Sequence, residues 1–150
     1  HFKPVKRRLE KIATVNTIEI YEDFAHHPTA IRTTLEGLRY HKPQGRIITL
    51  LELASNTMRA GIHKDTLIPS LALSDETYIL QTNILHNVTH SSDKPHIFYH
   101  DTVDNIITEV CKKAQLNDTI VIMSNRDFGG IYKKLPEALR QSLINSLSLF

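Results

Sequence analysis

The chain has 150 residues, 41% hydrophobic and 23% charged, which is the composition of one globular domain with a sizeable core. Its 18 basic and 16 acidic side chains are spread along the sequence and leave a formal charge of +2, so we expect no nucleic-acid partner. No apolar run approaches the roughly 20 residues that a membrane-spanning helix needs, so we expect no membrane contact. The single cysteine, Cys111, excludes a disulfide within the chain and favours a cytoplasmic location.

The first half of the chain alternates predicted strands with a helix. Residues 17–21 alternate polar with apolar side chains, which predicts a strand. Residues 28–38 then carry apolar residues at helical spacing, with a proline at the first position, as helix starts favour. Residues 46–51 form a continuous apolar run of the kind found in strands that are buried on both faces.

The second half continues the alternation. In chain order, the pattern predicts a helix over 64–73, a strand over 76–80, a helix over 101–114, a strand over 118–124 and a helix over 135–147. Pro69 limits the regularity of the first of these helices, whereas Pro136 fits the first turn of the last one. Between 81 and 100 the pattern indicates only an irregular excursion or a short strand around 96–99.

This alternation is typical of a doubly wound α/β sandwich with right-handed crossovers. We therefore expect three layers, α/β/α, around a mostly parallel sheet of about five or six strands. Ligands bind such sheets at the carboxyl ends of the strands. The loops 22–29, 52–63 and 124–130 are accordingly predicted to meet at one edge and to form the site.

Asp23, His26 and His27 stand between the first predicted strand and the helix that follows it, where short polar side chains can hold a ribose, a base or a metal. The alternative is a helix cap made by Asp23 or His27, although a cap gives no need for two histidines. Arg8, ahead of the first predicted strand, has a guanidinium that binds phosphate oxygens in bidentate fashion, but a solvated basic turn explains it equally well.

Two further loops carry candidate binding residues. The loop after the second predicted strand is dense in donors suited to an anionic substrate: Ser55, Asn56, Arg59, His63 and Lys64. The loop after the last strand contains two adjacent glycines together with Ser124, Asn125 and Phe128. A polar surface loop and a tight turn are the simpler interpretations of these two segments. The chain has no GxxxxGK[ST] phosphate loop, so it cannot bind and activate ATP alone by that route.

Four histidines form two pairs at i, i+4 spacing, which on a helix would place both imidazoles of a pair on one face: His86, His90, His96 and His100. The residues between them form helices poorly, and no Cys or Glu stands at ligand spacing. We therefore expect no metal site, and a histidine-rich metal binder remains only a hypothesis.

Taken together, these motifs are similar to the C-terminal domain of the Mur ligase family, and within it to the murein peptide ligase branch. The matching segments follow one another in order along nearly the whole chain: 5–10, 23–31 with His26-His27-Pro28-Thr29, 35–39, Ser55-Asn56-Thr57-Met58, 61–64, 123–125 and 128–130. The His-His-Pro-Thr segment is shared with the branch that adds L-alanine. The sequence departs from the family pattern at Leu53-Ala54, usually Pro-Arg, and at Arg126-Asp127, usually Gly-Gly.

The resemblance implies a Rossmann-like third domain, residues 1–150, excised from an enzyme whose N-terminal domain holds a UDP-sugar and whose central domain holds ATP and most of the Mg²⁺ contacts. Such an enzyme joins UDP-N-acetylmuramate to L-alanyl-γ-D-glutamyl-meso-diaminopimelate through an acyl phosphate in peptidoglycan recycling. The chain alone is then expected to be inactive and to hold no catalytic residue. Ligases that add L-alanine, and a non-catalytic nucleotide- or peptide-binding module, are the alternatives.

The same resemblance assigns roles to individual residues. Arg8 would contact the phosphates of ATP, Asp23 would accept hydrogen bonds from its ribose, and His26 and His27 would lie on the nucleotide side of the cleft. The peptide would face a second set of residues: Ser55, Asn56, Arg59, His63, Lys64, Ser124, Asn125 and Phe128.

Overall fold

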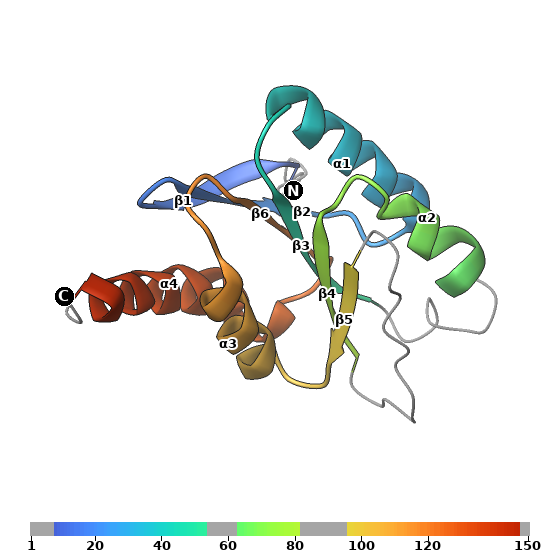
Figure 1. The fold of residues 1–150 in the computed structure, drawn as a ribbon. Helices are drawn as coiled ribbons and strands as arrows, with labels where there is room; N and C mark the ends of the chain where they lie inside the picture. Colours follow the sequence, from blue (N-terminus) through green and yellow to red (C-terminus); the bar gives the residue numbers. More distant parts are fainter. Residues whose placement is uncertain (1–7, 54–62, 82–95, 148–150) are drawn as a thin grey trace, which may run out of the picture.

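The computed structural model describes residues 8–53, 63–81 and 96–147, which form one sheet covered by helices on both faces (Figure 1). The strands are β1 (Glu10–Val15), β2 (Ile18–Asp23), β3 (Ile47–Glu52), β4 (Glu76–Leu80), β5 (His96–His100) and β6 (Thr119–Met123). The helical segments are α1 (Pro28–His41), η2 (His63–Leu67), α2 (Ile68–Ser70), α3 (Val103–Lys113), η3 (Phe128–Gly130) and α4 (Ile131–Leu147). The predicted α/β/α sandwich with a mostly parallel sheet is confirmed.

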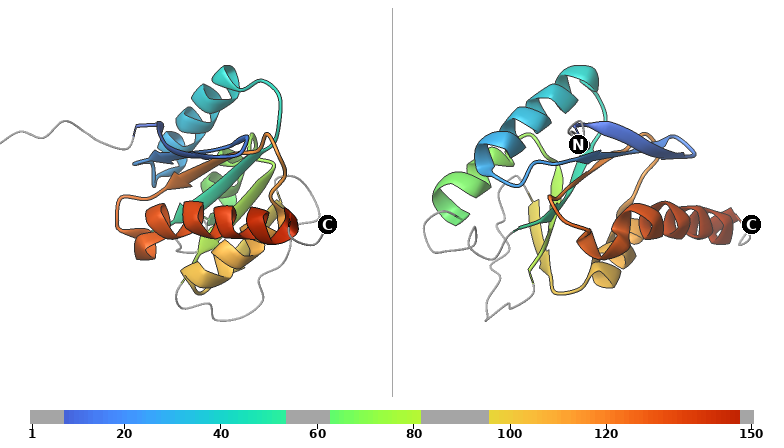
Figure 2. Two further views of the ribbon diagram at one scale, coloured as in Figure 1. Left: turned by 90° about the vertical axis from the view of Figure 1, so that its left-hand side faces the viewer. Right: turned by 180° about the vertical axis from the view of Figure 1, so that it is seen from behind.

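The strand order in the described part of the chain is β1-β2-β6-β3-β4-β5, and every neighbouring pair is parallel except β1 with β2. The chain leaves β2 for α1 on one face of the sheet, and it leaves the neighbouring strand β6 for α4 on the other face (Figure 2). Two adjacent strands whose connections run to opposite faces form the topological switch point at which α/β sheets bind ligands.

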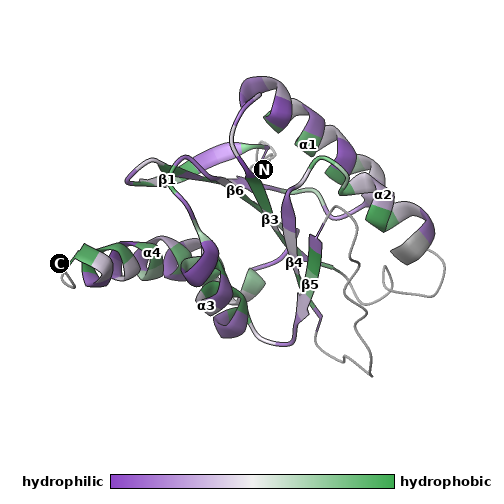
Figure 3. Cartoon of the chain, in the orientation of Figure 1, coloured by the Kyte–Doolittle hydropathy of each residue, from purple (hydrophilic) through white to green (hydrophobic). Residues whose placement is uncertain are grey.

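Apolar side chains on the central strands alternate between two hydrophobic clusters, one on each face of the sheet. In β6, Ile120 and Ile122 pack with residues of α3 and α4, whereas Val121 and Met123 pack with residues of α1. All four side chains are fully buried. The helices carry hydrophobic and hydrophilic residues in alternation along their length, as expected when one side of each covers the sheet (Figure 3). The mostly apolar runs in the sequence are therefore explained by strands with two buried faces.

The edge strand β1 is not expected from the sequence pattern. It pairs with β2 as a hairpin whose turn residues are Asn16 and Thr17, and Asn16 has φ +56°, a left-handed conformation that asparagine tolerates better than most residues. The register between the two strands shifts between Lys11 and Ala13. Such an irregularity interrupts the polar–apolar alternation by which a strand is recognised in a sequence.

Two predicted helices differ from the structure. The helix expected over 64–73 is divided into the π-helix η2 and the short α2, which contains Pro69, because proline lacks the N–H that a regular helix would use there. Helix α4 begins before residue 135, so the expectation that Pro136 lies in a first turn is wrong, and Pro136 lies inside the helix. The turn that precedes α4 ends at Gly129 and Gly130, which have positive φ angles, so the helix begins at Ile131 and not at residue 135. The short strand expected around 96–99 is confirmed as β5.

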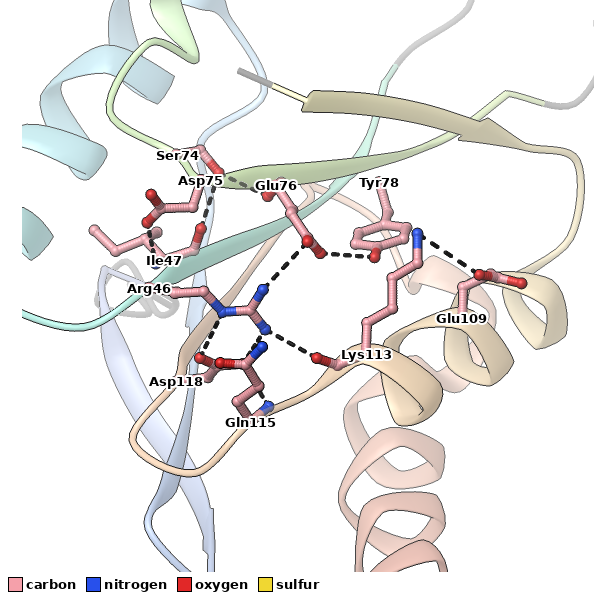
Figure 4. A network of polar contacts seen from close by, with 10 residues as sticks. All are labelled: Arg46, Ile47, Ser74, Asp75, Glu76, Tyr78, Glu109, Lys113, Gln115 and Asp118. Carbon is pink, nitrogen blue, oxygen red and sulfur yellow. Dashed lines mark hydrogen bonds and ion pairs between the residues drawn. The ribbon is translucent and has the colours of Figure 1, made fainter. Parts of the chain in front are cut away.

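A polar network holds the amino-terminal edge of the sheet together (Figure 4). Arg46, just before β3, donates from Nε to Asp118 Oδ1 at 3.0 Å and from Nη2 to Asp118 Oδ2 at 2.7 Å. It also donates to Glu76 Oε2, at the start of β4, at 3.2 Å. Asp118 precedes β6, is 2% exposed, and accepts a further hydrogen bond from Gln115 N. The network therefore ties the starts of three parallel strands at the edge opposite to the switch-point loops.

Candidate functional site

Asp23 ends β2 at the switch point and is almost buried, with 8% of its surface exposed. Its Oδ1 accepts hydrogen bonds from Ala25 N at 2.8 Å and Thr34 Oγ1 at 3.0 Å, and its Oδ2 accepts one from Leu9 N at 2.8 Å. Asp23 thus joins the segment before β1, the turn after β2 and helix α1. Since a carboxylate has about four acceptor positions, roughly one remains for a ligand.

The histidine pair at the start of α1 does not cap that helix. His27 is the N-cap residue, but its side chain accepts no hydrogen bond from the first turn. Its ring lies 4.1 Å from the ring of His26, which also packs edge-on against Phe24 at 5.7 Å. His26 Nδ1 lies 3.1 Å from the backbone oxygen of Phe24. The helix-capping alternative is therefore wrong for His27, and the two rings form part of a surface.

A cleft of about 460 Å³ opens between the segment before β1, the end of β2 and the first turns of α1. Its lining residues are Arg8, Leu9, Asp23, Phe24, Ala25, His26, His27, Ala30, Thr33 and Thr34. The four residues assigned to a nucleotide from the sequence thus line one cleft. Arg8 contributes an exposed cationic side chain to the cleft. Ala30 lies in the first turn of α1, so the positive end of the helix dipole also faces the cleft. This combination suits an anionic ligand.

A second polar cluster lies where β3 and β6 end side by side. Glu52 Oε1 accepts hydrogen bonds from Ser124 Oγ at 2.5 Å and from Phe128 N at 3.1 Å. Ser124 Oγ also accepts one from Arg126 N at 2.9 Å. The backbone N–H of Ser124 donates to the backbone oxygen of Asp23 at 3.2 Å. The cluster is therefore continuous, through the main chain, with the cleft at Asp23.

The structure places the residues assigned to a peptide in different situations. Ser124 and Phe128 are fully buried, so their side chains support the loop from within. Asn125 is partly exposed, and its buried Oδ1 has no hydrogen-bond partner among the residues that the structure describes. The other assigned residues are less defined: Ser55, Asn56 and Arg59 lie outside the described residues, and only the backbone is described for His63 and Lys64, which begin η2. Their binding roles remain predictions.

Two residues of the site are missing from the sequence-based assignment. Glu52 ends a buried strand at the carboxyl edge, and this position alone is a usable signal, because side chains there face the ligand-binding loops. Thr34 gives no such signal. It reaches Asp23 across 11 positions of sequence only because α1 packs back along the sheet.

The described residues give no support for a metal site, since they contain no cluster of three or more His, Cys, Asp or Glu side chains. His86 and His90 lie outside the described residues. His96 and His100 lie on β5, in agreement with the short strand expected there, so this pair does not have the helical arrangement that the metal-binder hypothesis requires. Burial lowers the pKa of His100, which stacks on the Tyr78 ring at 6.0 Å. Among the described helices, none has the length and apolarity required to cross a bilayer.

Comparison with known proteins identifies a family. The model of the family described as "Mur ligase, glutamate ligase domain" matches residues 7–126. UDP-N-acetylmuramate--L-alanyl-gamma-D-glutamyl-meso-2,6-diaminoheptandioate ligase of Haemophilus influenzae is 40% identical over 144 residues, which are 93% of this chain and 32% of the relative. The ligase of the same name from Escherichia coli is 44% identical over 144 residues, 92% of this chain and 31% of the relative. The chain spans about a third of the length of these curated relatives.

Solved structures agree with this finding. The crystal structure of a murein peptide ligase from Psychrobacter arcticus 273-4 superposes with a TM-score of 0.80 at 39% identity, covering 93% of this chain and 31% of that protein. A crystallised domain from Haemophilus ducreyi 35000HP superposes with a TM-score of 0.75 at 39% identity, covering 88% of this chain and 99% of that domain. The fold and the order of its elements are therefore shared along nearly the whole chain.

Proposed function

Because the chain belongs to the Mur ligase family, as its glutamate ligase domain, we propose that it is the C-terminal domain of an ATP-dependent ligase. We propose further that the enzyme joins UDP-N-acetylmuramate to L-alanyl-γ-D-glutamyl-meso-diaminopimelate, the reaction named for relatives that are 40% and 44% identical. The observation that carries the proposal is the cleft that Arg8, Asp23, His26 and His27 line together at the switch point of the sheet.

The chemistry of this cleft fits the phosphates and ribose of a nucleotide. Arg8 binds phosphate oxygens through its guanidinium, and the first turn of α1 contributes its positive dipole end. Asp23 keeps about one acceptor position for a ribose hydroxyl. Asp23 also accepts a hydrogen bond from the backbone N–H of Leu9, the residue after Arg8. Leu9 has a positive φ of +50°, an unfavourable backbone conformation that this hydrogen bond helps to stabilise. Asp23 therefore orients the segment that carries Arg8.

In the proposed reaction a carboxylate would take the γ-phosphoryl group of ATP with release of ADP, and the incoming amine would then form the amide bond as phosphate leaves the acyl phosphate. The contribution of this domain is to position both partners, since positioning and charge stabilisation are the main sources of rate in phosphoryl transfer. Arg8 neutralises phosphate charge on one side of the switch point. The 124–130 loop, held by Glu52, faces the peptide on the other side. We propose that Mg²⁺ is held mainly by the other domains and that the enzyme acts in peptidoglycan recycling in the cytoplasm.

Steady-state kinetics of the full-length protein test this function. With UDP-N-acetylmuramate and ATP present, phosphate release should depend on the tripeptide and not on free L-alanine, and the Arg8→Ala variant should lose kcat/KM for ATP by about 100-fold. A preference for L-alanine would favour the alanine-adding ligases, of which one from Mycobacterium marinum is 45% identical over 84 residues, 53% of this chain. Absence of ATP turnover with either amine would leave a non-catalytic binding module.

A further inference from the structure

Glu52 makes two hydrogen bonds with one oxygen at the ligand-binding edge of the sheet. Its Oε1 accepts from Ser124 Oγ at 2.5 Å and from Phe128 N at 3.1 Å, and these donors are the first residue after β6 and the first residue of η3. One carboxylate oxygen at the end of β3 therefore contacts two points of the 124–130 turn that follows the neighbouring strand β6.

The turn that Glu52 holds has a conformation that needs support. Phe128 has φ +50°, which is unfavourable for a residue with a large side chain, and Gly129 and Gly130 follow with φ +58° and +77°. The buried Phe128 ring fixes one side of this turn in the core. The hydrogen bond from Phe128 N to Glu52 fixes the other side. Without that acceptor, a backbone N–H in a strained turn would have to find another partner.

The same oxygen acts on the residues between Ser124 and Phe128. Because Ser124 Oγ donates to Glu52, its lone pairs are directed toward the N–H of Arg126, which donates to it at 2.9 Å. The two residues that follow Ser124, namely Asn125 and Arg126, are thus placed by a short chain of hydrogen bonds that starts at Glu52. Arg126 is exposed, and Asn125 has a buried Oδ1 without a hydrogen-bond partner in the described part of the chain.

We propose that Glu52 is a positioning residue, which sets the 124–130 turn so that Asn125 and Arg126 can bind the incoming peptide. This inference rests on the proposed function for the identity of the ligand. A guanidinium suits the carboxylates of an acidic peptide, and the amide N–H₂ of the partly exposed Asn125 can donate to the same carboxylates. Both hydrogen bonds from the turn reach a single oxygen of Glu52. The positioning role therefore requires a hydrogen-bond acceptor at that point and does not require a negative charge.

This last point separates positioning from direct participation. A glutamine at position 52 keeps an oxygen that accepts from Ser124 and Phe128, whereas an alanine removes it. A carboxylate that took a proton from the substrate or bound its ammonium group through charge would be lost in both variants. The Glu36→Ala variant is a matched control, since Glu36 is an exposed glutamate on α1 without a described contact.

The experiment measures kinetics of the full-length protein and amide hydrogen exchange of the peptide that contains residues 124–130. We expect Glu52→Ala to raise KM for the tripeptide by about tenfold while KM for ATP changes by less than about twofold, and Glu52→Gln to recover most of the peptide affinity. Amide exchange over 124–130 should accelerate in Glu52→Ala and stay near wild type in Glu52→Gln. Glu36→Ala should match wild type in every measurement.

Three results would overturn the inference: equal damage from Glu52→Gln and Glu52→Ala, an unchanged tripeptide KM in Glu52→Ala, or unchanged exchange over 124–130 in Glu52→Ala. A general loss of folding would instead raise exchange throughout the domain, and the Glu52→Gln variant, which keeps the acceptor, then decides through its tripeptide KM. If the wild-type enzyme does not use the tripeptide at all, the proposed function fails and the peptide role of Glu52 fails with it. The exchange measurement then still shows whether Glu52 holds the turn.

Discussion

Replacing Asp23 with alanine should separate its contribution to stability from any contribution to ligand binding. The substitution removes the acceptor of three hydrogen bonds, from Leu9 N, Ala25 N and Thr34 Oγ1. A hydrogen bond contributes about 0.5–1.5 kcal/mol net, and a buried donor left without a partner costs about 1–3 kcal/mol. Because Ala25 is 5% exposed and its N–H would be such a donor, we expect the free energy of unfolding to fall by about 2–4 kcal/mol.

Urea unfolding of the 150-residue chain, followed by circular dichroism, measures this loss. Thr34→Val is the matched control, because it removes only one of the three hydrogen bonds and should lower the free energy of unfolding by about 1 kcal/mol. In the full-length protein, Asp23→Ala should also raise KM for ATP, because Asp23 lines the proposed nucleotide cleft. An Asp23→Ala chain within about 0.5 kcal/mol of wild type would refute the view that this carboxylate anchors the segment that carries Arg8.

The remaining predictions concern the sheet edge, the loop and pH. Arg46→Met should lower the free energy of unfolding, measured in urea, by about 2–4 kcal/mol, since it leaves the nearly buried Asp118 without its bidentate partner. An Arg46→Met/Asp118→Asn double variant that is as unstable as the single variant would contradict this explanation. Gly129→Ala should lower the melting temperature, because the φ of Gly129 is +58° and a Cβ there would meet a methyl group of Val103 at 2.6 Å. Gly37→Ala, with open space around the added Cβ, should instead raise the free energy of unfolding by about 0.5–1 kcal/mol. Equal effects of the two substitutions would exclude the steric explanation. Burial lowers the pKa of His100 in the folded state, so stability should be complete above the unfolded pKa of about 6.5 and should fall as the pH drops below it. In His100→Phe this part of the pH dependence should disappear from urea midpoints measured between pH 5 and pH 8, and an unchanged profile would assign it to another group.

Much of the sheet was predictable because strands that are buried on both faces have a recognisable run of apolar residues in the sequence. The runs at 46–51 and 118–124 are mostly apolar, with Ile, Leu, Val and Met at successive positions, and both become central parallel strands. The hairpin strand β1 was not predictable in the same way, since its register irregularity between Lys11 and Ala13 breaks the alternation. The start of α4 was misplaced because Pro136 looks like a helix start, while the turn is in fact completed by glycines with positive φ.

The candidate site was predictable only in part. A carboxylate and two histidines after a strand point to the cleft, and the structure places them on it together with Arg8. What a sequence cannot show is where the two oxygens of Asp23 are directed, because their donors come from three separate segments. The same holds for Glu52, whose partners lie 72 and 76 positions further along the chain.

The tie between Arg46, Asp118 and Glu76 has a consequence for how this domain can diversify. It fixes the alignment of β3, β4 and β6 at the amino-terminal ends of these strands, opposite to the candidate site. The register of these strands therefore does not depend on the loop that follows β6 at the opposite end. We expect that this loop can differ between relatives without a change in the sheet. Grafting a foreign 124–130 loop onto this scaffold should therefore leave the underlying architecture intact, provided that the acceptor at position 52 is kept.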